Sequence, residues 1–572
     1  MTESLRANGG TNATDVLIVG GGPVGLSLGI ELARLGVPAV LVDARDGTIK
    51  TPKMNFVNVR SMEFCRRWGL TETVRAAGHP ADFHPNVVWA TSVTGHEIAR
   101  LDFPPFLAEK TRFFSPAADC LISQYWFDPI LLAHARAQPS LTLRHRTRLD
   151  SFREADGGIA ARVTDLVSGR AETVTAAFIV GCDGAASMVR DSLGIGLEGL
   201  PAMQNNFHVF LNSTELIEIF ERTLGQARFC NLVGPEGVWG MITSINWRGL
   251  WRFSMQPPPA DESRVPDLLR HAVGRDFDFE LIDSSHWVSR KLVADAFRKG
   301  RAFIAGDAAH QLNPSGGFGM NTGVGDAVDL AWKLWGTLAG WGGPELLASY
   351  EIERRPIAVR NVEEATRNFR LPQKFVVGPA IDRDTAEGAR QREAFTASLY
   401  DADIMRHHDT DGIALGYRYD PSPIVWPDGT EAPADAVRDY AQTARPGHRA
   451  PHAWLDGGPP PSAGMRLEGG RSTLDQFGNG FVLLDFGAAS GEAARLAREA
   501  AVRGVPFEVA TIAEPDIAAL YARRLVLVRP DGHVAWRADV APADAGAVID
   551  RVRGAGAARA KEVGQAQPVA MS

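Results

Sequence analysis

Cysteine is scarce in this 572-residue chain, which holds only four, at Cys65, Cys120, Cys182 and Cys230. They lie far apart, without a CxxC pair and without the spacing of a metal site. This usage suits a reducing compartment, so we expect a cytoplasmic protein that holds no metal. Because no cysteine follows Cys230, thiol redox chemistry is excluded from the C-terminal third of the chain.

Long hydrophobic runs and a strong charge balance are also missing. No apolar run approaches the ~18 residues of a membrane-spanning segment, and the polar residues 1–14 are typical of a frayed end rather than a signal peptide. The net charge of -8 gives no electrostatic reason to expect a nucleic-acid partner. The composition, 45% apolar, is that of a globular protein long enough for two to four domains.

A βαβ pattern lies near the start of the chain. Residues 16–19 are expected to form a buried strand, followed by a glycine turn, a helix over 26–35, and a second strand over 40–42 that ends at an acid. In such a turn the glycines let the chain reverse, let a pyrophosphate approach the backbone, and let helix and strand pack closely. The pattern predicts a dinucleotide site at Gly20, Gly22, Pro23, Val24, Gly25, Asp43, Ala44 and Arg45.

The glycine pattern alone does not separate FAD from NAD. No second copy follows it in the chain, which favours FAD as a resident cofactor. An ordinary βαβ unit with an incidental acid is the structural alternative.

Two later strands also end at glycine and aspartate. Residues 178–180 lead into Asp183 and Gly184, and residues 301–305 lead into Gly306 and Asp307. Ligands bind at the carboxyl ends of strands in open α/β sheets. The glycine-rich loop after Pro314 leaves backbone N–H groups free to face a ligand, and we expect a helix to resume over residues 325–334. A merely mobile loop would not explain the aspartate at the strand end.

The three motifs, in this order, resemble those of the single-component (group A) flavoprotein aromatic hydroxylases, and "YEIERRP" at 350–356 resembles the segment that follows their last motif. The resemblance implies that Asp307 contacts the ribityl chain of FAD. It also implies that Asn55 lies near the substrate. Further FAD contacts are implied at Arg60, Gln124, Pro314, Gly317, Gly319, Met320 and Asn321.

Two positions depart from the family pattern. Ala186 stands where an arginine is common, and Asp329 stands where an asparagine is frequent. We interpret the second as a change on a helix surface.

The resemblance further implies a reaction. NAD(P)H, with NADPH expected over NADH, reduces FAD, and a flavin C4a-hydroperoxide passes one oxygen of O2 to a phenol. A deprotonated phenol reacts faster, which calls for a base or polar relay. Candidates are His208, Arg228, Arg252 and His286, each of which has a structural alternative; Pro314 is counted with the catalytic positions as the residue that shapes the loop. A structural role is expected for His310.

Residues 205–287 are expected to form antiparallel strands that face the substrate. Period-two alternation places Trp239, Met241, Thr243 and Ile245 on one face, and Trp251 and Phe253 together on the next strand. Trp239, Met241 and Phe253 are the predicted substrate contacts, although such aromatic stripes equally suit a core.

The C-terminal third predicts a separate unit. Strands over 481–487 and 506–512 flank a helix over 491–502, and a hairpin turns at residues 530–532. This order resembles a thioredoxin-like fold of phenol-hydroxylase-type members, with a structural or dimer-contact role.

The fold class expected is α/β: a discontinuous Rossmann-like FAD-binding domain, an inserted mixed-sheet substrate domain and a C-terminal thioredoxin-like domain. The expected boundaries are FAD-binding parts at 1–80, 116–200 and 291–375, substrate-domain segments at 81–115 and 201–290, a helical linker region at 376–445, the thioredoxin-like domain at 446–555 and a disordered tail at 556–572.

The leading hypothesis is therefore an FAD- and NAD(P)H-dependent hydroxylase of a small phenolic aromatic, active as a homodimer without nucleic-acid or membrane partners. A larger polycyclic substrate remains an alternative. A halogenase would need a "WxWxIP" motif and a disulfide reductase paired cysteines after the first glycine turn, and neither occurs. A non-enzymatic flavin-binding scaffold stays open.

Overall fold

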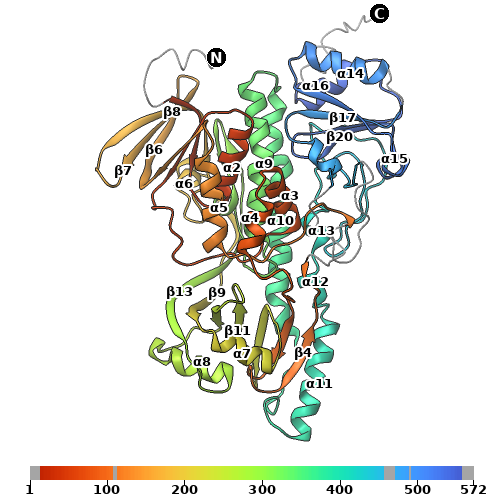
Figure 1. The fold of residues 1–572 in the computed structure, drawn as a ribbon. Helices are drawn as coiled ribbons and strands as arrows, with labels where there is room; N and C mark the ends of the chain where they lie inside the picture. The colour runs from red at the N-terminus through yellow and green to blue at the C-terminus, as the bar shows by residue number, and fades with distance from the viewer. Residues whose placement is uncertain (1–12, 107–112, 456–469, 488–490, 557–572) are drawn as a thin grey trace, which may run out of the picture.

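The computed structural model describes residues 13–106, 113–455, 470–487 and 491–556. Three β-sheets and two long central helices make up most of this part of the chain (Figure 1). The expected tail lies outside the described residues except for Gly556. The prediction of a frayed end was wrong for Ala13 and Thr14, because these two residues begin the first strand.

The first sheet has the order β14-β15-β8-β1-β2-β5, with the β6–β7 hairpin attached to β8. β1 pairs in parallel with β2 and β8, and β15 pairs in parallel with β8. β15 arrives after the whole second sheet, which makes this unit discontinuous in sequence. Its strands are β1 (Ala13–Val19), β2 (Ala39–Asp43), β5 (Leu141–His145), β6 (Thr147–Ala155), β7 (Gly158–Asp165), β8 (Ala171–Gly181), β14 (Arg298–Lys299) and β15 (Ala302–Ile304).

The second sheet has the order β16-β13-β9-β12-β11-β10-β3-β4 and lies below the first in Figure 1. Its pairs are antiparallel except for β10 with β3. Two helices, α7 (Glu215–Arg222) and α8 (Val265–Val273), supply apolar side chains to the core on one face. The strands are β3 (Val87–Ala90), β4 (Glu97–Leu101), β9 (Leu197–Asn212), β10 (Phe229–Gly234), β11 (Gly237–Ser244), β12 (Leu250–Met255), β13 (Glu280–Ala294) and β16 (His310–Gln311).

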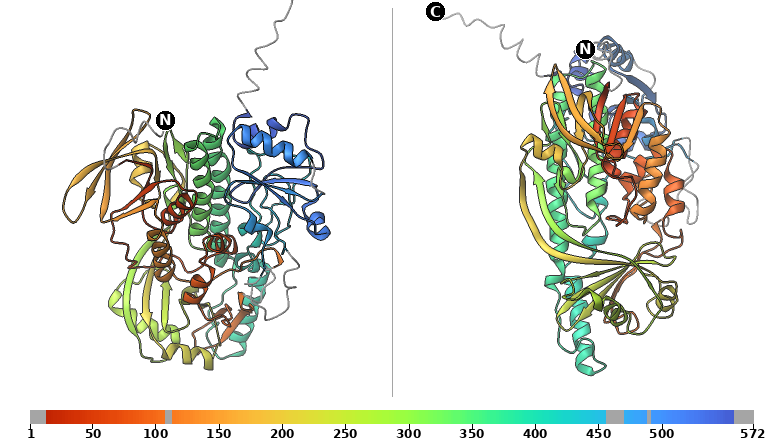
Figure 2. Two further views of the ribbon diagram at one scale, coloured as in Figure 1. Left: turned by 45° about the horizontal axis from the view of Figure 1, so that its top comes forward. Right: turned by 90° about the vertical axis from the view of Figure 1, so that its left-hand side faces the viewer.

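Two helices connect the three sheets. α9 (Phe318–Leu338) packs on α2 (Pro23–Arg34), and α10 (Pro344–Arg370) packs on α9 and on β13. With 27 residues, α10 is about 40 Å long. It runs from beside the C-terminal unit down to the second sheet, as Figure 1 and the side view on the right of Figure 2 show.

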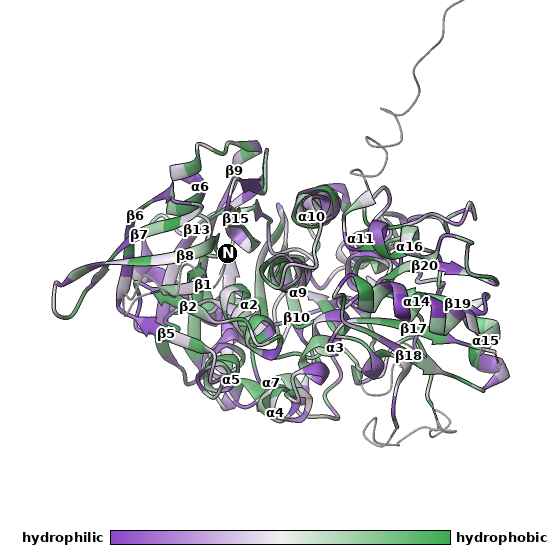
Figure 3. Ribbon diagram, turned by 90° about the horizontal axis from the view of Figure 1, so that it is seen from above, coloured by the Kyte–Doolittle hydropathy of each residue, from purple (hydrophilic) through white to green (hydrophobic). Residues whose placement is uncertain are grey.

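The C-terminal sheet has the order β18-β17-β19-β20, formed by β17 (Phe481–Asp485), β18 (Phe507–Thr511), β19 (Leu525–Val528) and β20 (Val534–Ala538). Its core is continuous with α9, because Trp332 packs edge-on against Phe481. Seen from above, α9 and α10 lie between the hydrophobic strands of the two upper sheets (Figure 3). The predicted α/β class with three such units is confirmed.

A buried ion-pair cluster joins the C-terminal hairpin to α9 and α10. Arg529 donates to Glu353 at 2.7 Å, to Asp329 at 3.0 Å and to Asp531 at 2.7 Å, and Lys333 contacts the first two of these acids. The interpretation of Asp329 as a helix-surface residue was wrong: its side chain is 1% exposed. We call Asp329, Lys333, Glu353, Arg529 and Asp531 the interdomain ion cluster.

The remaining α-helices of the described residues have between 4 and 16 residues. They are α3 (Val59–Arg67), α4 (Thr71–Ala77), α5 (Gln124–Arg136), α6 (Met188–Leu193), α11 (Ala386–Asp401), α12 (Met405–His408), α13 (Asp411–Ala414), α14 (Gly491–Val502), α15 (Pro515–Tyr521) and α16 (Ala545–Val552). Within the described ranges, no helix has the length and apolar composition that crossing a membrane requires.

Candidate active site

The first glycine turn is closely packed on one side, where no side chain fits, and open on the other side. A Cβ on Gly20, whose φ is +108°, would lie 2.3 Å from the carbonyl oxygen of Cys182, and a Cβ on Gly25 would lie 1.9 Å from that of Gly20. A Cβ on Gly22 would meet nothing within 4 Å. The open side therefore faces outward at the N-terminus of α2, where a pyrophosphate fits and the helix dipole favours it.

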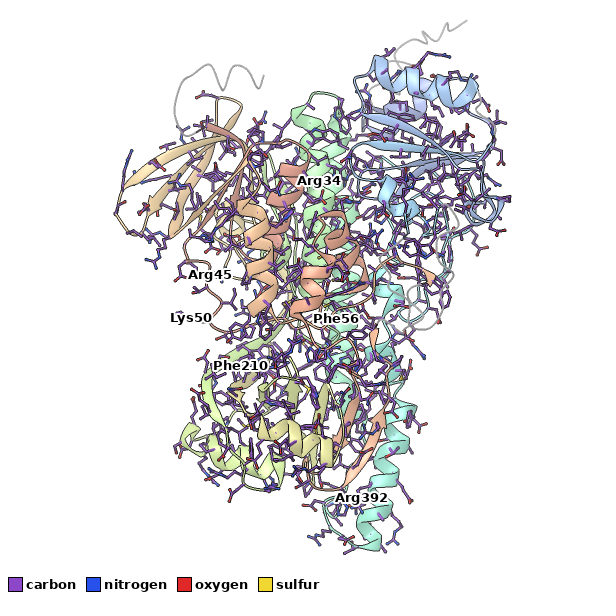
Figure 4. The ribbon with its side chains drawn as sticks, in the orientation of Figure 1. Arg34, Arg45, Lys50, Phe56, Phe210 and Arg392 are labelled. Carbon is purple, nitrogen blue, oxygen red and sulfur yellow. The ribbon has the colours of Figure 1, made fainter. Side chains whose placement is uncertain are left out.

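Asp43 fixes this turn from the end of β2. Its carboxylate accepts hydrogen bonds from the backbone N–H of Gly21 at 2.6 Å and of Arg45 at 2.7 Å. Arg45 pairs with Asp43 and is the more exposed of these two side chains. In Figure 4, Arg45 lies below the first sheet. The geometry suits an adenosine whose ribose lies beside Asp43.

The second and third strand ends differ in what their aspartates do. Asp183 is engaged internally, since it accepts from the Ser187 hydroxyl at 2.5 Å and from the Val189 N–H at 3.2 Å. Burial raises the pKa of Asp183. Asp307 is half-buried and has no hydrogen-bond partner among the described residues. Of these two carboxylates, Asp307 is the one free to bind the hydroxyls of a polyol chain.

Ala186, where the family's arginine is missing, is exposed. Arg190 instead ties the neighbouring loops together, donating to the carbonyl oxygens of Ala185 at 3.0 Å and Ala308 at 3.4 Å.

A buried aspartate that sequence reasoning missed supports the turn at Gly306. Asp326 accepts from the Gly306 N–H at 3.1 Å, from His310 Nε2 at 2.7 Å and from Arg354 Nε at 2.8 Å. Burial alone would raise the pKa of Asp326, but the adjacent His310 and Arg354 hold it below its usual range. The signal available in the sequence was an acid within the apolar stretch of α9.

The glycine-rich segment becomes helical earlier than predicted. α9 begins at Phe318 rather than Gly325, with Gly317 as its N-cap at φ +69°. The close packing of this helix requires glycine at Gly323, because a Cβ there would lie 2.5 Å from the Val24 side chain. Gly319, Met320 and Asn321 thus form a first helical turn whose free N–H groups favour negative charge in front of it.

Side chains around this turn are fixed by the chain itself. Asn321 Nδ2 donates to the carbonyl oxygens of Gly317 at 2.7 Å and Phe56 at 3.2 Å. Pro314 is exposed beside the turn. Gln124, at the N-terminus of α5, donates to Asp128 at 2.8 Å.

Arg60 does not have the role that the resemblance implied. Its guanidinium donates to Glu63 at 2.6 Å, to the carbonyl oxygen of Asp531 at 2.8 Å and to the Tyr417 hydroxyl at 3.4 Å. These contacts turn Arg60 toward the C-terminal unit, so the structure makes it an interdomain contact rather than an FAD ligand.

One face of the second sheet carries the candidate substrate contacts. Cross-strand partners point to the same side, and the register pairs Thr243 with Arg252, Arg252 with Phe210, and His208 with Ser254. Met241 pairs with Ser254 on the same side. We call these residues the site face; Phe210 is labelled in Figure 4, where it lies below Lys50 and Phe56.

Two of the predicted substrate contacts lie on the opposite face. Phe253 is fully buried in the core formed with α7 and α8. Trp239 lies on the same face, because the register of β10 and β11 shifts after Leu232 and leaves Trp239 without a partner in β10. Its ring contacts Phe253 at 5.9 Å and His271 of α8 at 5.4 Å between centroids. Alternation was therefore wrong for Trp239. Phe253 does share a face with Trp251, as predicted, but that face is the core, so of the three predicted substrate contacts only Met241 lies on the site face.

The two histidines proposed as bases have other partners. His286 is half-exposed on the far face, 2.8 Å from Glu262, so it cannot reach a ring on the site face. His208 does lie on the site face, but its Nε2 accepts a hydrogen bond from the Trp287 indole at 2.8 Å. Burial, with a smaller effect of Arg252, lowers the pKa of His208 to about 2. His208 is thus neutral and a poor proton acceptor.

His208→Asn is accordingly expected to leave the pH dependence of kcat/KM unchanged between pH 5 and 9. A group with a pKa near 2 does not titrate in this range. A pH–rate profile of the variant checks this, and loss of an ionisation near neutrality would show that His208 is the base after all.

Residues of α12 that the sequence did not single out close the site from the side. His407 and His408 stack at 4.6 Å, and His408 lies 6.4 Å from the ring of Phe229. Burial lowers the pKa of His407 to about 4, and burial and His407 lower that of His408 further. His408 therefore lies beside Phe229 with His407 stacked against it, and both were missed because only the fold brings α12 next to β10.

Comparison with known proteins agrees with this geometry. The family model of the FAD binding domain matches residues 13–365, and that of the aromatic-ring hydroxylase C-terminal domain matches residues 443–556. Aklavinone 12-hydroxylase RdmE of Streptomyces purpurascens is 33% identical over 563 residues, covering 94% of this chain and 98% of its own. Phenol 2-monooxygenase of a Pseudomonas species is 30% identical over 575 residues, covering 93% and 91%. The solved structure of RebC with bound 7-carboxy-K252c is similar at a TM-score of 0.87 and 40% identity, covering 96% of this chain and all of that one. The chain belongs to the FAD-dependent aromatic-ring hydroxylases and is a flavoprotein monooxygenase.

Proposed function

We propose that this monooxygenase hydroxylates a phenolic ring that is part of a polycyclic aromatic substrate, with NADPH and O2 as co-substrates. The observation that carries the proposal is the width of the accessible surface on the site face. Phe229, Met241, Arg252, His208 and Trp287 are all partly accessible, and they come from five successive strands, β10, β11, β12, β9 and β13. At about 4.8 Å per strand, this surface spans roughly 19 Å, which is wider than a single phenol ring.

The relatives are consistent with either size of substrate. Phenol 2-monooxygenase is named for a single-ring substrate, whereas RdmE is named for aklavinone and RebC was solved with 7-carboxy-K252c. The width of the site face favours the larger class for this chain.

When bound, FAD supplies the chemistry of accepting a hydride and activating dioxygen. The chain's own contribution is to hold the cofactor and shape the site. Asp307 binds the polyol chain, and the first turn of α9 stabilises negative charge next to it. Phe56, buried between the α9 turn and the second sheet, helps to exclude water from the reacting ring.

The sequence contains no second dinucleotide-binding motif that would mark a site for NAD(P)H. A nicotinamide that visits only transiently accounts for this. NADPH is our proposed donor.

The test is reductant consumption and product identification with two matched panels. One panel holds single-ring phenols, the other hydroxylated anthraquinones and similar polycyclic phenols, each with NADPH and with NADH. We expect a polycyclic phenol to accelerate NADPH oxidation and to gain one oxygen by mass spectrometry. Preference for the single-ring panel would restore the smaller substrate class. Reductant oxidation that yields only hydrogen peroxide with every compound would contradict the proposed function.

A further inference from the structure

A series of buried contacts joins the C-terminal unit to the strand-end turn at Gly306. At its centre is Arg354 of α10, whose side chain is 1% exposed. Its Nε donates to Asp326 at 2.8 Å, its Nη2 to the carbonyl oxygen of Thr322 at 3.0 Å, and its Nη1 to the Tyr419 hydroxyl at 3.2 Å. One guanidinium therefore contacts both α9 and the segment that leads into the C-terminal unit.

On the α9 side, the carboxylate that Arg354 holds also holds the turn. The second oxygen of Asp326 accepts the Gly306 N–H at 3.1 Å and lies 2.7 Å from His310 Nε2. Gly306, at φ +62°, directly precedes Asp307, the carboxylate expected to bind FAD. A displacement of the guanidinium would therefore move the Asp326 carboxylate, and with it the backbone that directs Asp307.

The start of α9 is held in the same way. A Cβ on Gly325 would lie 2.8 Å from Nη2 of Arg354, so glycine at this position makes room for the guanidinium against the helix. Two turns further along α10, Asn361 donates to the Thr322 hydroxyl at 2.9 Å. These polar contacts fix the rotation of α9 directly after residues 319–321, the expected flavin neighbours.

On the other side, Tyr419 is packed into the C-terminal hairpin. Its ring lies 4.3 Å from the ring of His533, between centroids, and 4.8 Å from the Arg529 guanidinium. Its backbone N–H donates to the carbonyl oxygen of Gly447 at 2.9 Å, and the Gly447 N–H donates to that of Val534 in β20 at 2.7 Å. The position of the Tyr419 hydroxyl is thus set by the C-terminal unit.

The N–H donors of a guanidinium point in fixed directions within one plane. Arg354 can meet its three partners only while they keep their relative positions, so a shift at Tyr419 changes the contact with Asp326. We propose that Arg354 is a positioning residue for the turn at Gly306, and that the C-terminal unit acts through Tyr419 and Arg354 on the affinity and geometry of FAD binding. The inference goes beyond the proposed function, because it does not depend on the substrate. It gives a role to a unit that contains no cysteine.

The first test removes one oxygen atom. Tyr419→Phe keeps the ring but takes away the acceptor for Arg354. Titration of the cofactor-free variant should show a Kd for FAD about 5- to 10-fold higher, at the lower end of typical coupling between two sites. At saturating FAD, the visible circular dichroism of the bound flavin should differ from that of the unmodified protein. Arg354→Lys keeps a charge beside Asp326 without the planar fork and should weaken FAD binding further.

The matched control is Tyr417→Phe. This neighbouring hydroxyl accepts from Arg60 at 3.4 Å and not from Arg354, so both readouts should stay unchanged. An equal loss of FAD affinity in Tyr417→Phe and Tyr419→Phe would overturn the inference, because the effect would then belong to general packing. Tyr419→Phe with the Kd and the circular dichroism of the unmodified protein would overturn it as well.

The second test needs no variant, so misfolding of a variant cannot rescue the idea. Coupling is reciprocal: if contacts of the C-terminal unit strengthen FAD binding, bound FAD must strengthen those contacts by the same factor. Hydrogen exchange of the unmodified protein should slow about 5- to 10-fold at the amides of Tyr419 and Gly447 when FAD is added, and less in β18 at the far edge of the same sheet. Exchange at both amides that slows no more than in β18 would refute the coupling. Neither test uses substrate or reductant, so its outcome is independent of the proposed hydroxylation.

Discussion

Arg529→Met should destabilise the protein by about 3–5 kcal/mol, the cost of breaking a buried ion pair by removing one partner. Arg529 is fully buried and contacts three carboxylates of the interdomain ion cluster. Without it, Lys333 is the one cation among the described residues that still pairs with Asp329 and Glu353. Methionine preserves much of the volume, so the loss reports charge rather than a cavity.

Chemical denaturation of the variant, followed by tryptophan fluorescence, measures this loss. Arg523→Met is the matched control, because Arg523 is partly exposed and lies 3.6 Å from an exposed acid, Asp539. We expect the control to change stability by less than about 1 kcal/mol. A similar small change for Arg529→Met would mean that the cluster does not hold the C-terminal unit to α9 and α10.

The charge balance of this cluster explains why aspartate at position 329, where related sequences often have asparagine, is not a harmless change on the surface. Two cations face three carboxylates, and burial raises the pKa of Asp329 while Arg529 and Lys333 lower that of Glu353 to about 2 despite burial. In the sequence, Asp329 and Lys333 look like a common i,i+4 surface pair. Their true partner, Arg529, lies 200 residues away from Asp329, a distance that no local pattern spans.

The parts of the fold that local patterns control were predictable. The β1–α2–β2 unit follows from its apolar runs and glycine spacing, and the helix at 491–502 has the expected bounds. Predictions failed where one residue shifts a register. The irregular pairing at Trp239 moves its ring to the core face, and no alternation rule anticipates such a shift.

In the candidate site, too, features with a local sequence pattern were predictable and features assembled from distant segments were not. The strand-end turns that are predicted to hold the cofactor could be located in the sequence, because glycine and aspartate at strand ends leave a local signature. The substrate side was only partly found, because its donors and walls come from separate segments. Thr243 and Arg252 meet through the pairing of β11 with β12, and His408 meets Phe229 only through packing of α12. Likewise, Arg60 was misassigned because its partners Tyr417 and Asp531 are distant in sequence.

Asp307→Ala should purify with much less flavin than the unmodified protein, since the carboxylate is the free acceptor at the end of β15. Loss of hydrogen bonds to a charged group weakens binding by about 1.5–3 kcal/mol, or roughly 10- to 100-fold in Kd. Because Asp307 has no side-chain partner among the described residues, the folding stability of the cofactor-free protein should stay unchanged. Asp307→Asn keeps an acceptor oxygen and is expected to fall between the two.

Flavin absorbance per mole of protein and titration of cofactor-free protein with FAD measure these differences. Asp295→Ala is the control, an exposed aspartate that follows β13 and whose carboxylate accepts the Gly196 N–H at 3.1 Å. Flavin content equal to that of the unmodified protein would refute the assignment of Asp307. A parallel fall in the stability of cofactor-free Asp307→Ala would instead assign the residue to the turn itself, the part that Gly306 and Asp326 hold by a 3.1 Å hydrogen bond. The two readouts together therefore decide whether the carboxylate serves the ligand or the loop.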